Sequence, residues 1–380
     1  MKKSLSIMFT LLLLFLLPAC GGEEEEDDWG NDGDGGNSGN NEENGGWESQ
    51  EGQDGKILNT RAKLIRVLAI GPDDTIYIGG ETEDNLYSEL QGKRDAFLVA
   101  FNSEGEELWG KQWNVGGKGE DYVFRIIVDN EGYLYISGST SESYYIMKFA
   151  SNGTKIWEQI STFGQISSLA LDAEKNVYVA HRSSGEIIKY STNGNELKQY
   201  NIPNSTSNQL NTISIDSEGN IYAGGYTMGT LFAENAGSLD AFLVKLAPDG
   251  TQQWGKQWGA TKQDIIENIE IDKQNNIYVV GYTDNKDSEI FSKFDSDGNK
   301  IWGYAENYIR LAICNKTIYT VKAGHNNGKI DQYNLNGEHI GSTAIVQEEG
   351  FAYVGCNSEE NVYTLTSNYK IIKFSPSDFK

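Results

Sequence analysis

Hydrophobic and polar residues alternate in short runs from about residue 57 to the end of this chain. Runs rich in Val, Ile, Tyr and Phe with a period of two are typical of β-strands that bury one face. One stretch contains four such runs in succession, at 212–216, 220–225, 241–246 and 252–258. The turn after the first run carries Asp and Gly, which favour tight turns through local hydrogen bonds and positive φ. The pattern predicts an all-β chain.

This four-strand unit occurs seven times. Each copy has an Asp-x-x-Gly-Asn-like turn followed by an aliphatic residue and a tyrosine. The seven tyrosines are Tyr77, Tyr135, Tyr178, Tyr222, Tyr278, Tyr319 and Tyr363. Their spacing of 41 to 58 residues, with several strands in each unit, is a propeller signature. The sequence therefore predicts a single β-propeller with seven four-stranded blades.

A glycine marks the turn between the third and fourth run of six units, and in four of them a tryptophan follows four residues later. These tryptophans are Trp109, Trp157, Trp254 and Trp302. A fixed offset puts a large aromatic ring at one point of each outer strand. We expect it to cover the seam between neighbouring blades and to bury roughly 150–250 Å².

These motifs resemble the SBBP family, a bacterial seven-bladed β-propeller repeat. The resemblance rests on Asp-x-x-Gly-Asn-Ile-Tyr, on Asp-Ala-Phe-Leu-Val at 95–99 and 240–244, and on the Gly-to-Trp offset. The fourth unit matches nearly throughout, and the third, sixth and seventh lack the tryptophan. The resemblance covers most of the chain and implies a fold, because the family has no uniform activity.

The seventh unit ends at Lys380, just after its third predicted strand, 370–374, so its fourth strand is missing. Residues 56–61 precede the first unit and have no other role. We expect them to supply the missing outer strand and close the ring, because closure removes the open edges that promote aggregation.

The N-terminus has the features of a secretory signal. Lys2 and Lys3 precede an apolar run, 5–17, which is shorter than the roughly 20 residues of a membrane span. The run ends in Leu17-Pro18-Ala19-Cys20, which resembles the lipobox of bacterial lipoproteins. That resemblance implies a signal peptide over 1–19 and acyl chains, such as palmitate, on Cys20. The membrane would then be a partner through this lipid.

An acidic stretch follows Cys20. Residues 21–56 hold thirteen Asp or Glu and one Lys, among Gly and Asn. Such a composition cannot bury enough apolar surface to fold, so residues 20–55 are expected to be a disordered tether and 56–380 the propeller. The run 23–28 resembles the export tag of Bacteroidetes surface lipoproteins. It implies an outer-membrane protein that faces the cell exterior, whereas a plain solvated tether is the alternative.

The composition excludes several kinds of site. A net charge of −24 leaves no basic patch for nucleic acid. The three histidines, His181, His325 and His339, have no metal-ligand spacing, so we expect no metal, no cofactor and no catalytic residue. Cys314 and Cys356 lie near the first strands of adjacent units. Two buried free thiols are favoured there, with a disulfide as the alternative, because neighbouring inner strands are often too far apart.

Loop length varies on one face of the predicted propeller, the face of the loops between second and third strands. The loops 81–95 and 227–240 are the longest. Rigid scaffolds carry function on variable loops, so this face is the candidate ligand surface. Its tentative ligand-binding residues are Tyr87, Arg94, Tyr122, Phe232 and Glu234.

The function expected from the sequence is a lipid-anchored, non-enzymatic binding or scaffold module of the cell envelope, with a protein or glycan ligand. An envelope-assembly scaffold, similar to the propeller lipoprotein of the outer-membrane assembly machine, is one alternative. A propeller enzyme that cleaves glycans or uses a quinone is the other. The scarcity of histidine and the lack of paired catalytic motifs count against an enzyme.

Overall fold

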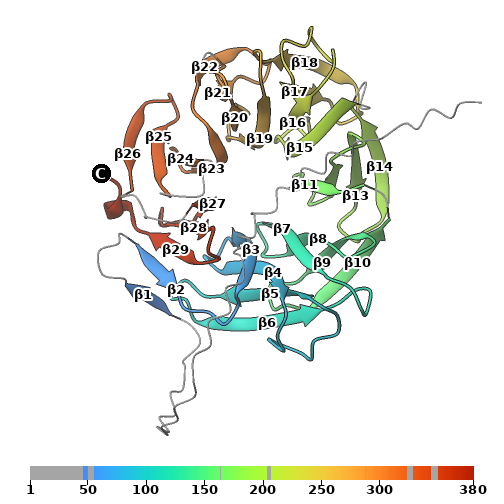
Figure 1. The fold of residues 1–380 in the computed structure, drawn as a ribbon, viewed down its shortest axis with the longest axis vertical. Coiled ribbons are helices and arrows are strands. Elements are labelled where there is room, and N and C mark those ends of the chain that lie inside the picture. The colour runs from blue at the N-terminus through green and yellow to red at the C-terminus, as the bar shows by residue number, and fades with distance from the viewer. Residues whose placement is uncertain are drawn as a thin grey trace, which may run out of the picture. The chain divides into compact units, whose positions relative to one another are not determined.

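The computed structural model describes residues 46–49, 55–162, 164–202, 207–286, 288–322, 328–343 and 350–380. Its strands form seven antiparallel sheets that surround a central axis (Figure 1). Six sheets have four strands and one has five. The prediction of a single all-β propeller with seven blades is confirmed. Among the described residues, no helix combines the length and the apolar character needed to cross a membrane.

Six blades place their strands in chain order from the axis outward, and the seventh takes its outer strands from the N-terminal segment. The innermost strands are β3 (Leu64–Ile70), β7 (Tyr122–Val128), β11 (Ile166–Leu171), β15 (Asn208–Ile215), β19 (Asp264–Ile271), β23 (Tyr308–Cys314) and β27 (Phe351–Cys356). The second strands are β4 (Ile76–Thr82), β8 (Leu134–Ser139), β12 (Val177–His181), β16 (Ile221–Thr227), β20 (Ile277–Thr283), β24 (Thr317–Lys322) and β28 (Val362–Thr366).

The outer half of each blade follows the same order. The third strands are β5 (Asp95–Phe101), β9 (Tyr144–Phe149), β13 (Glu186–Tyr190), β17 (Asp240–Leu246), β21 (Phe291–Phe294), β25 (Ile330–Asn334) and β29 (Ile371–Phe374). The fourth strands are β6 (Glu107–Trp113), β10 (Lys155–Ser161), β14 (Glu196–Asn201), β18 (Gln252–Trp258), β22 (Lys300–Tyr304), β26 (His339–Ser342) and β2 (Lys56–Leu58). Strand β1 (Trp47–Ser49) lies beyond β2, and a short 3-10 helix, Pro376–Asp378, follows β29.

The repeated Asp turn is held by its own side chains. Asp216 Oδ1 accepts hydrogen bonds from the backbone N–H groups two and four residues later, both at 2.9 Å. Its Oδ2 accepts from the Asn220 amide at 2.8 Å and from the Tyr222 hydroxyl at 3.1 Å. Asp172 and Asp272 make the same contacts in their blades. The Asp, Asn and Tyr of the motif therefore form one polar cluster that fixes the turn.

The tryptophans cover the seams between blades, as predicted. The Trp254 ring lies 6.0 Å from that of Tyr222, and its Nε1 donates to the carbonyl of Ser296 in the next blade at 3.1 Å. A Cβ atom on Gly298 would lie 3.0 Å from the indole, so this turn needs glycine. The other three tryptophans make equivalent bonds to the next blade: Trp109, Trp157 and Trp302.

Two blades without this tryptophan use another aromatic side chain, which the sequence pattern does not reveal. In the third blade Tyr200 stacks on Tyr178 at 6.0 Å and donates to the carbonyl of Pro248 at 3.1 Å. In the sixth blade Phe379, from the C-terminal end, packs 5.2 Å from Tyr319. Together with the four tryptophans, these two rings close six of the seven seams between blades.

The ring is closed by the N-terminal segment, as predicted. Strand β2 pairs with β29, and Lys56 lies opposite Lys373 and Ile57 opposite Ile372. The strand ends at Leu58 rather than at residue 61. The third-strand edge of the seventh blade, which would otherwise face solvent, is thereby paired.

A second N-terminal strand lies where the sequence places tether. Residues 47–49 form β1, which pairs with β2, and Trp47 lies opposite Leu58. The Trp47 Nε1 donates to the carbonyl of Ser103 at 3.0 Å. Trp47 is thus the seam tryptophan of the seventh blade. The tether is predicted from the average composition of residues 20–55. The acidic and small residues around 47–49 dominate that average, so it does not reveal this short strand.

Cys314 and Cys356 form a disulfide, so the expectation of two free thiols is wrong. They are the last residues of the adjacent inner strands β23 and β27, and their Cα atoms are 6.3 Å apart. Inner strands converge at the axis of a propeller, and the pair lies within the distance that a disulfide spans.

Candidate functional site

The two long loops expected on the ligand face fold back over their own blades. Gln112, on outer strand β6, accepts bonds through Oε1 from the backbone N–H groups of Leu86 and Tyr87 at 2.8 and 2.9 Å. Its Nε2 donates to Asp95 at 3.0 Å. Gln257 and Asp240 anchor the loop of the fourth blade in the same way. The repeated sequences around these residues therefore serve to fasten loops.

Two tentative ligand residues are packed within these loops. Tyr87 lies across Gly110, where a Cβ atom would be 2.0 Å from its ring, and Phe232 lies across Gly255 at 2.3 Å. Both rings are half-buried between the loop and the outer strand. Because glycine has no side chain, Gly110 and Gly255 leave room on the outer strands for the rings of Tyr87 and Phe232. Glu234, in the same loop as Phe232, is exposed.

The structure brings Arg94 and Tyr122 together near the inner edge of the first and second blades. Arg94 Nε donates to Glu83 at 2.8 Å. The Tyr122 hydroxyl donates to Glu120, and the guanidinium of Arg66 lies 5.2 Å from the centre of the Tyr122 ring. These two residues belong to a network of ion pairs and rings on the loop face. Their contact with a ligand stays a prediction, as does that of Tyr87, Phe232 and Glu234.

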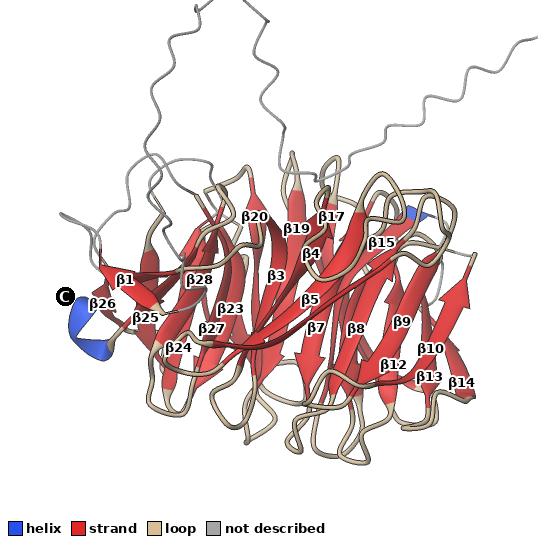
Figure 2. Cartoon of the chain, turned by 90° about the horizontal axis from the view of Figure 1, so that it is seen from below, coloured by secondary structure: helices blue, strands red, loops and turns tan. Residues whose placement is uncertain are grey.

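Each inner strand contains one β-bulge, and the bulges lie at similar positions along the seven strands. The pairing of every inner strand with its second strand skips one residue. The skipped residues are Arg66, Phe124, Ser167, Asn211, Glu267, Ile309 and Ala352. A bulge turns side chains away from the regular alternation. Figure 2 shows from the side how the strands run between two ends that carry loops. Each bulge falls within the first four residues of its inner strand, so the seven bulges form a collar near the loop-face end of the central channel.

The residue after each bulge has one of two roles. On one side of the ring it joins neighbouring blades. Ser168, Thr212 and Asn268 accept bonds from backbone N–H groups of the next inner strand at 3.2, 3.3 and 3.0 Å. On the other side the equivalent residues include Arg310 and Tyr353, which line the channel with longer side chains. The collar is therefore closed in some blades and carries long polar side chains in others.

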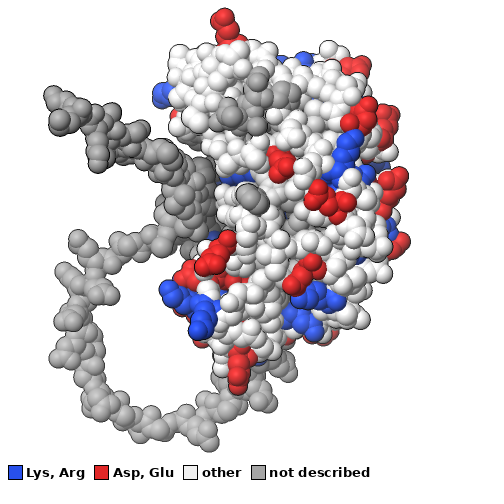
Figure 3. Space-filling model, turned by 90° about the vertical axis from the view of Figure 1, so that its right-hand side faces the viewer, with Lys and Arg blue, Asp and Glu red and all other residues white. Residues whose placement is uncertain are grey.

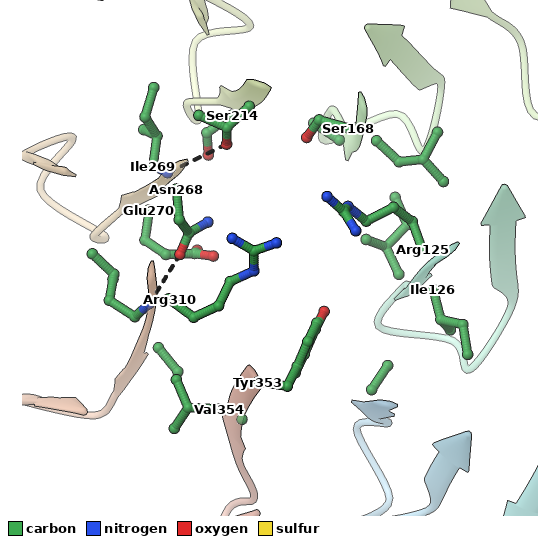
Figure 4. Close-up of a pocket in the computed structure, with 18 of the residues that line it drawn as sticks. Arg125, Ile126, Ser168, Ser214, Asn268, Ile269, Glu270, Arg310, Tyr353 and Val354 are labelled. Atoms are coloured by element: carbon green, nitrogen blue, oxygen red, sulfur yellow. Dashed lines mark hydrogen bonds between the residues drawn. The ribbon is translucent and has the colours of Figure 1, made fainter. Parts of the chain in front are cut away.

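These long side chains define a cavity of about 480 Å³ in the channel. In Figure 4 the side chains of Arg125 and Arg310 enter it from different blades, and the hydroxyl end of Tyr353 points into the space between them. Burial raises the pKa of Tyr353, while Arg125 and Arg310 act in the opposite direction. At neutral pH its hydroxyl is therefore a hydrogen-bond donor beside two cations.

Acidic side chains of the fifth blade face the same channel. Burial raises the pKa of Glu267, and the charges of Arg310, Arg182 and Arg125 oppose that shift. Three residues further along the strand, burial raises the pKa of Glu270 to about 7, with a bond from Asn268 acting against it. Glu270 can therefore gain or lose a proton near neutral pH.

The histidines that the structure describes do not line this cavity. Within the part of the chain that the structure describes, no group of three or more His, Cys, Asp or Glu side chains is arranged to hold a metal ion. His181 is buried, and His339 lies 3.0 Å from the hydroxyl of Ser342 on an outer strand. His325 and Cys20, the residue predicted to carry a lipid, lie outside the described residues.

Sequence reasoning missed the channel residues. Arg125, Glu267, Glu270 and Arg310 occupy inner strands whose other residues are mostly aliphatic. A long charged residue inside an aliphatic inner strand is the sequence feature that could have indicated a polar channel. The outer surface gives no comparable signal, because acidic and basic side chains are intermixed over the side seen in Figure 3.

Comparisons with known proteins agree with the fold. The family described as SBBP, beta-propeller repeat, matches residues 197–233 and 251–287. Each match runs from an outer strand into the first two strands of the next blade, so the sequence repeat spans a blade seam. No curated protein matches the sequence.

Solved structures with a similar fold have varied descriptions. A catalytically inactive virginiamycin B lyase from Staphylococcus aureus with quinupristin has a TM-score of 0.57 at 12% identity, covering 86% of this chain and 97% of the lyase. The Pan2 WD40 domain of Neurospora crassa has a TM-score of 0.54 at 14% identity, covering 83% and 90%. The C-terminal WD40 domain of Sif2 has a TM-score of 0.53 at 9% identity, covering 83% and 82%. At such identities the likeness is one of fold.

Proposed function

We propose that this chain, a seven-bladed β-propeller built from SBBP-type repeats, is a non-enzymatic binding module of the cell envelope. Its ligand, a protein or a glycan, docks on the loop face at the mouth of the central channel. The observation that carries this proposal is the cavity into which Arg125, Arg310 and Tyr353 project. Convergent polar side chains in a concave, preformed site are the usual mark of a ligand site.

The anchor part of the proposal rests on Cys20 and the acidic run behind it. A lipid on Cys20 holds the protein in the outer membrane, and the propeller faces the cell exterior. The change Cys20→Ser should move the protein from the detergent phase to the aqueous phase on partitioning. Protease treatment of intact cells should degrade the wild-type propeller. Protection equal to that of a periplasmic marker would instead favour the envelope-assembly scaffold.

Ligand binding is tested with full-length protein on a glycan array and by cross-linking on cells. Replacing Tyr353 by Ala removes a ring that points into the cavity and should weaken binding at least ten-fold. Asp297→Asn changes an exposed turn residue at the opposite end of the blades and is the matched control. Equal loss in both variants, or loss only in the control, would contradict docking at the channel mouth.

A further inference from the structure

The six arginines of the chain fall into two classes. Three of them pair with carboxylates: Arg61 with Glu107, Arg66 with Glu81, and Arg94 with Glu83. The other three are Arg125, Arg182 and Arg310. Among the described residues, none of these three has a carboxylate oxygen within 4.0 Å. In a protein of net charge −24, carboxylates are abundant, so arginines without a carboxylate partner are unexpected.

Two of the three unpaired arginines belong to the collar, and the third lies beside it. Arg125 and Arg310 follow the bulges of their inner strands and line the cavity. Arg182 lies just after β12, and its Nη1 donates to the side chain of Asn211, a bulge residue, at 2.9 Å. Guanidinium groups from the second, third and sixth blades are therefore close enough to act on Arg125 and Glu267 at the collar.

Few of their donors are used within the protein. Arg125 Nη1 donates to the carbonyl of Phe124 at 3.0 Å. Arg310 Nη1 donates to the carbonyl of Ile309 at 2.7 Å and to that of Glu267 at 3.5 Å. The Nε of Arg182 is buried and has no hydrogen-bond partner among the described residues. Each guanidinium carries five N–H donors, so most of them stay free for a ligand. A buried donor without a partner carries a desolvation penalty that a bound acceptor would remove.

The three charges also repel one another. Burial, followed by the charges of Arg310 and Arg182, lowers the pKa of Arg125 to about 10. A pKa of about 10 leaves Arg125 protonated at neutral pH. Glu267 and Glu270 face the same channel, and Glu270 can hold its proton near neutral pH. The three guanidinium groups therefore leave an excess of one to two positive charges, and a dianion would neutralise an excess of two.

We propose that Arg125, Arg182 and Arg310 bind a phosphate dianion, either free or as a phosphomonoester on the ligand. The inference deepens the proposed function and rests on it, since it names the group that the channel mouth recognises. Planar guanidinium forks bind phosphate oxygens in pairs, and a terminal phosphate offers three oxygens to three forks. Glu267 lies among the arginines and should lower the affinity for the anion.

Calorimetric titration of the full-length protein in detergent tests the proposal. The probes are inorganic phosphate and glucose 6-phosphate at pH 7.5, with glucose as the uncharged control. Both phosphates should bind, and the tighter of the two identifies the free or the esterified form. Arg125→Gln, Arg182→Gln and Arg310→Gln should each weaken binding at least ten-fold. Glu267→Gln should strengthen it, and Arg61→Gln, a paired arginine on the outer side, should leave it unchanged.

Thermal unfolding separates a binding role from a structural one. Without phosphate, Arg125→Gln should unfold at the same temperature as the wild type or higher, because it removes like-charge repulsion. Phosphate should raise the wild-type Tm, by linkage of binding to folding, and should no longer raise that of an R125Q/R310Q double variant. An equal shift in both proteins, no shift in either, or tighter binding of succinate than of either phosphate would overturn the inference. Glycan or protein binding that ignores competing phosphate would overturn it too, while leaving the proposed function intact.

Discussion

The ring of Trp47 lies 5.8 Å from the ring of Tyr363, and this contact joins the N-terminal segment to the last blade. It repeats the Trp254–Tyr222 contact of the fourth blade, where the rings are 6.0 Å apart. Trp47 also donates to Ser103 of the first blade. One side chain from the N-terminal segment therefore completes the seventh blade and seals its seam with the first.

Loss of Trp47 should weaken the whole ring. Trp47→Ala removes a half-buried indole and its bond across the seam, and should lower the free energy of unfolding by about 2–3 kcal/mol. Trp47→Phe keeps most of the packing and should cost about 1 kcal/mol. Urea denaturation of full-length protein measures both. Trp29→Ala is the control, and an equal effect of Trp29 and Trp47 would argue against the seam role.

The Cys314–Cys356 disulfide should add stability by restricting the unfolded chain. It closes a loop across a sequence separation of 42 residues, for which loop-closure entropy gives about 4 kcal/mol as an upper range. The double variant Cys314→Ala/Cys356→Ala should therefore unfold at lower urea concentration, by roughly 2–4 kcal/mol. Adding a reductant to the wild type should reproduce the shift. A variant as stable as the wild type under oxidising conditions would contradict this.

The glycines under the folded-back loops should tolerate no side chain. A methyl group at Gly255 would lie 2.3 Å from the Phe232 ring, so Gly255→Ala should cost about 1–3 kcal/mol. Adding Phe232→Ala removes the clash, and a double-mutant cycle should show a favourable coupling for the pair. Gly116→Ala is the matched control, because nothing lies within 4 Å of the added atom. Additive effects would show that the two residues do not meet.

Glu270 should make stability depend on pH. Burial raises its pKa from 4.5 to about 7, so the folded protein holds this proton more tightly than the unfolded chain does. The favourable contribution is present below about pH 4.5 and is lost as pH rises to about 7. Glu270→Gln should be more stable than the wild type above pH 7, by about 1–3 kcal/mol after allowance for water in the channel. A stability difference that does not grow between pH 5 and pH 7 would disprove the assignment.

Several features followed from the sequence because they depend on local patterns. The Asp216 turn, the Tyr222 position and the Gly250-to-Trp254 offset recur at a fixed spacing, and each repeats the same short-range contacts. Repetition establishes the number of blades, and the missing last strand points to closure by the segment at 56–61. The steric and hydrogen-bond preferences that form turns and strands involve residues a few positions apart, so they can be predicted from the sequence alone.

Other features depended on where distant segments meet. Phe379 and Trp47 take the place of seam aromatics only once the chain ends reach the sixth and seventh blades. Whether the cysteines pair depended on the spacing of two inner strands at the axis. Arg125, Arg182 and Arg310 are separated by tens of residues and come close to one another only because the ring closes. Tertiary structure alone decides such convergence, because no local pattern encodes which side chains from different blades face the same space.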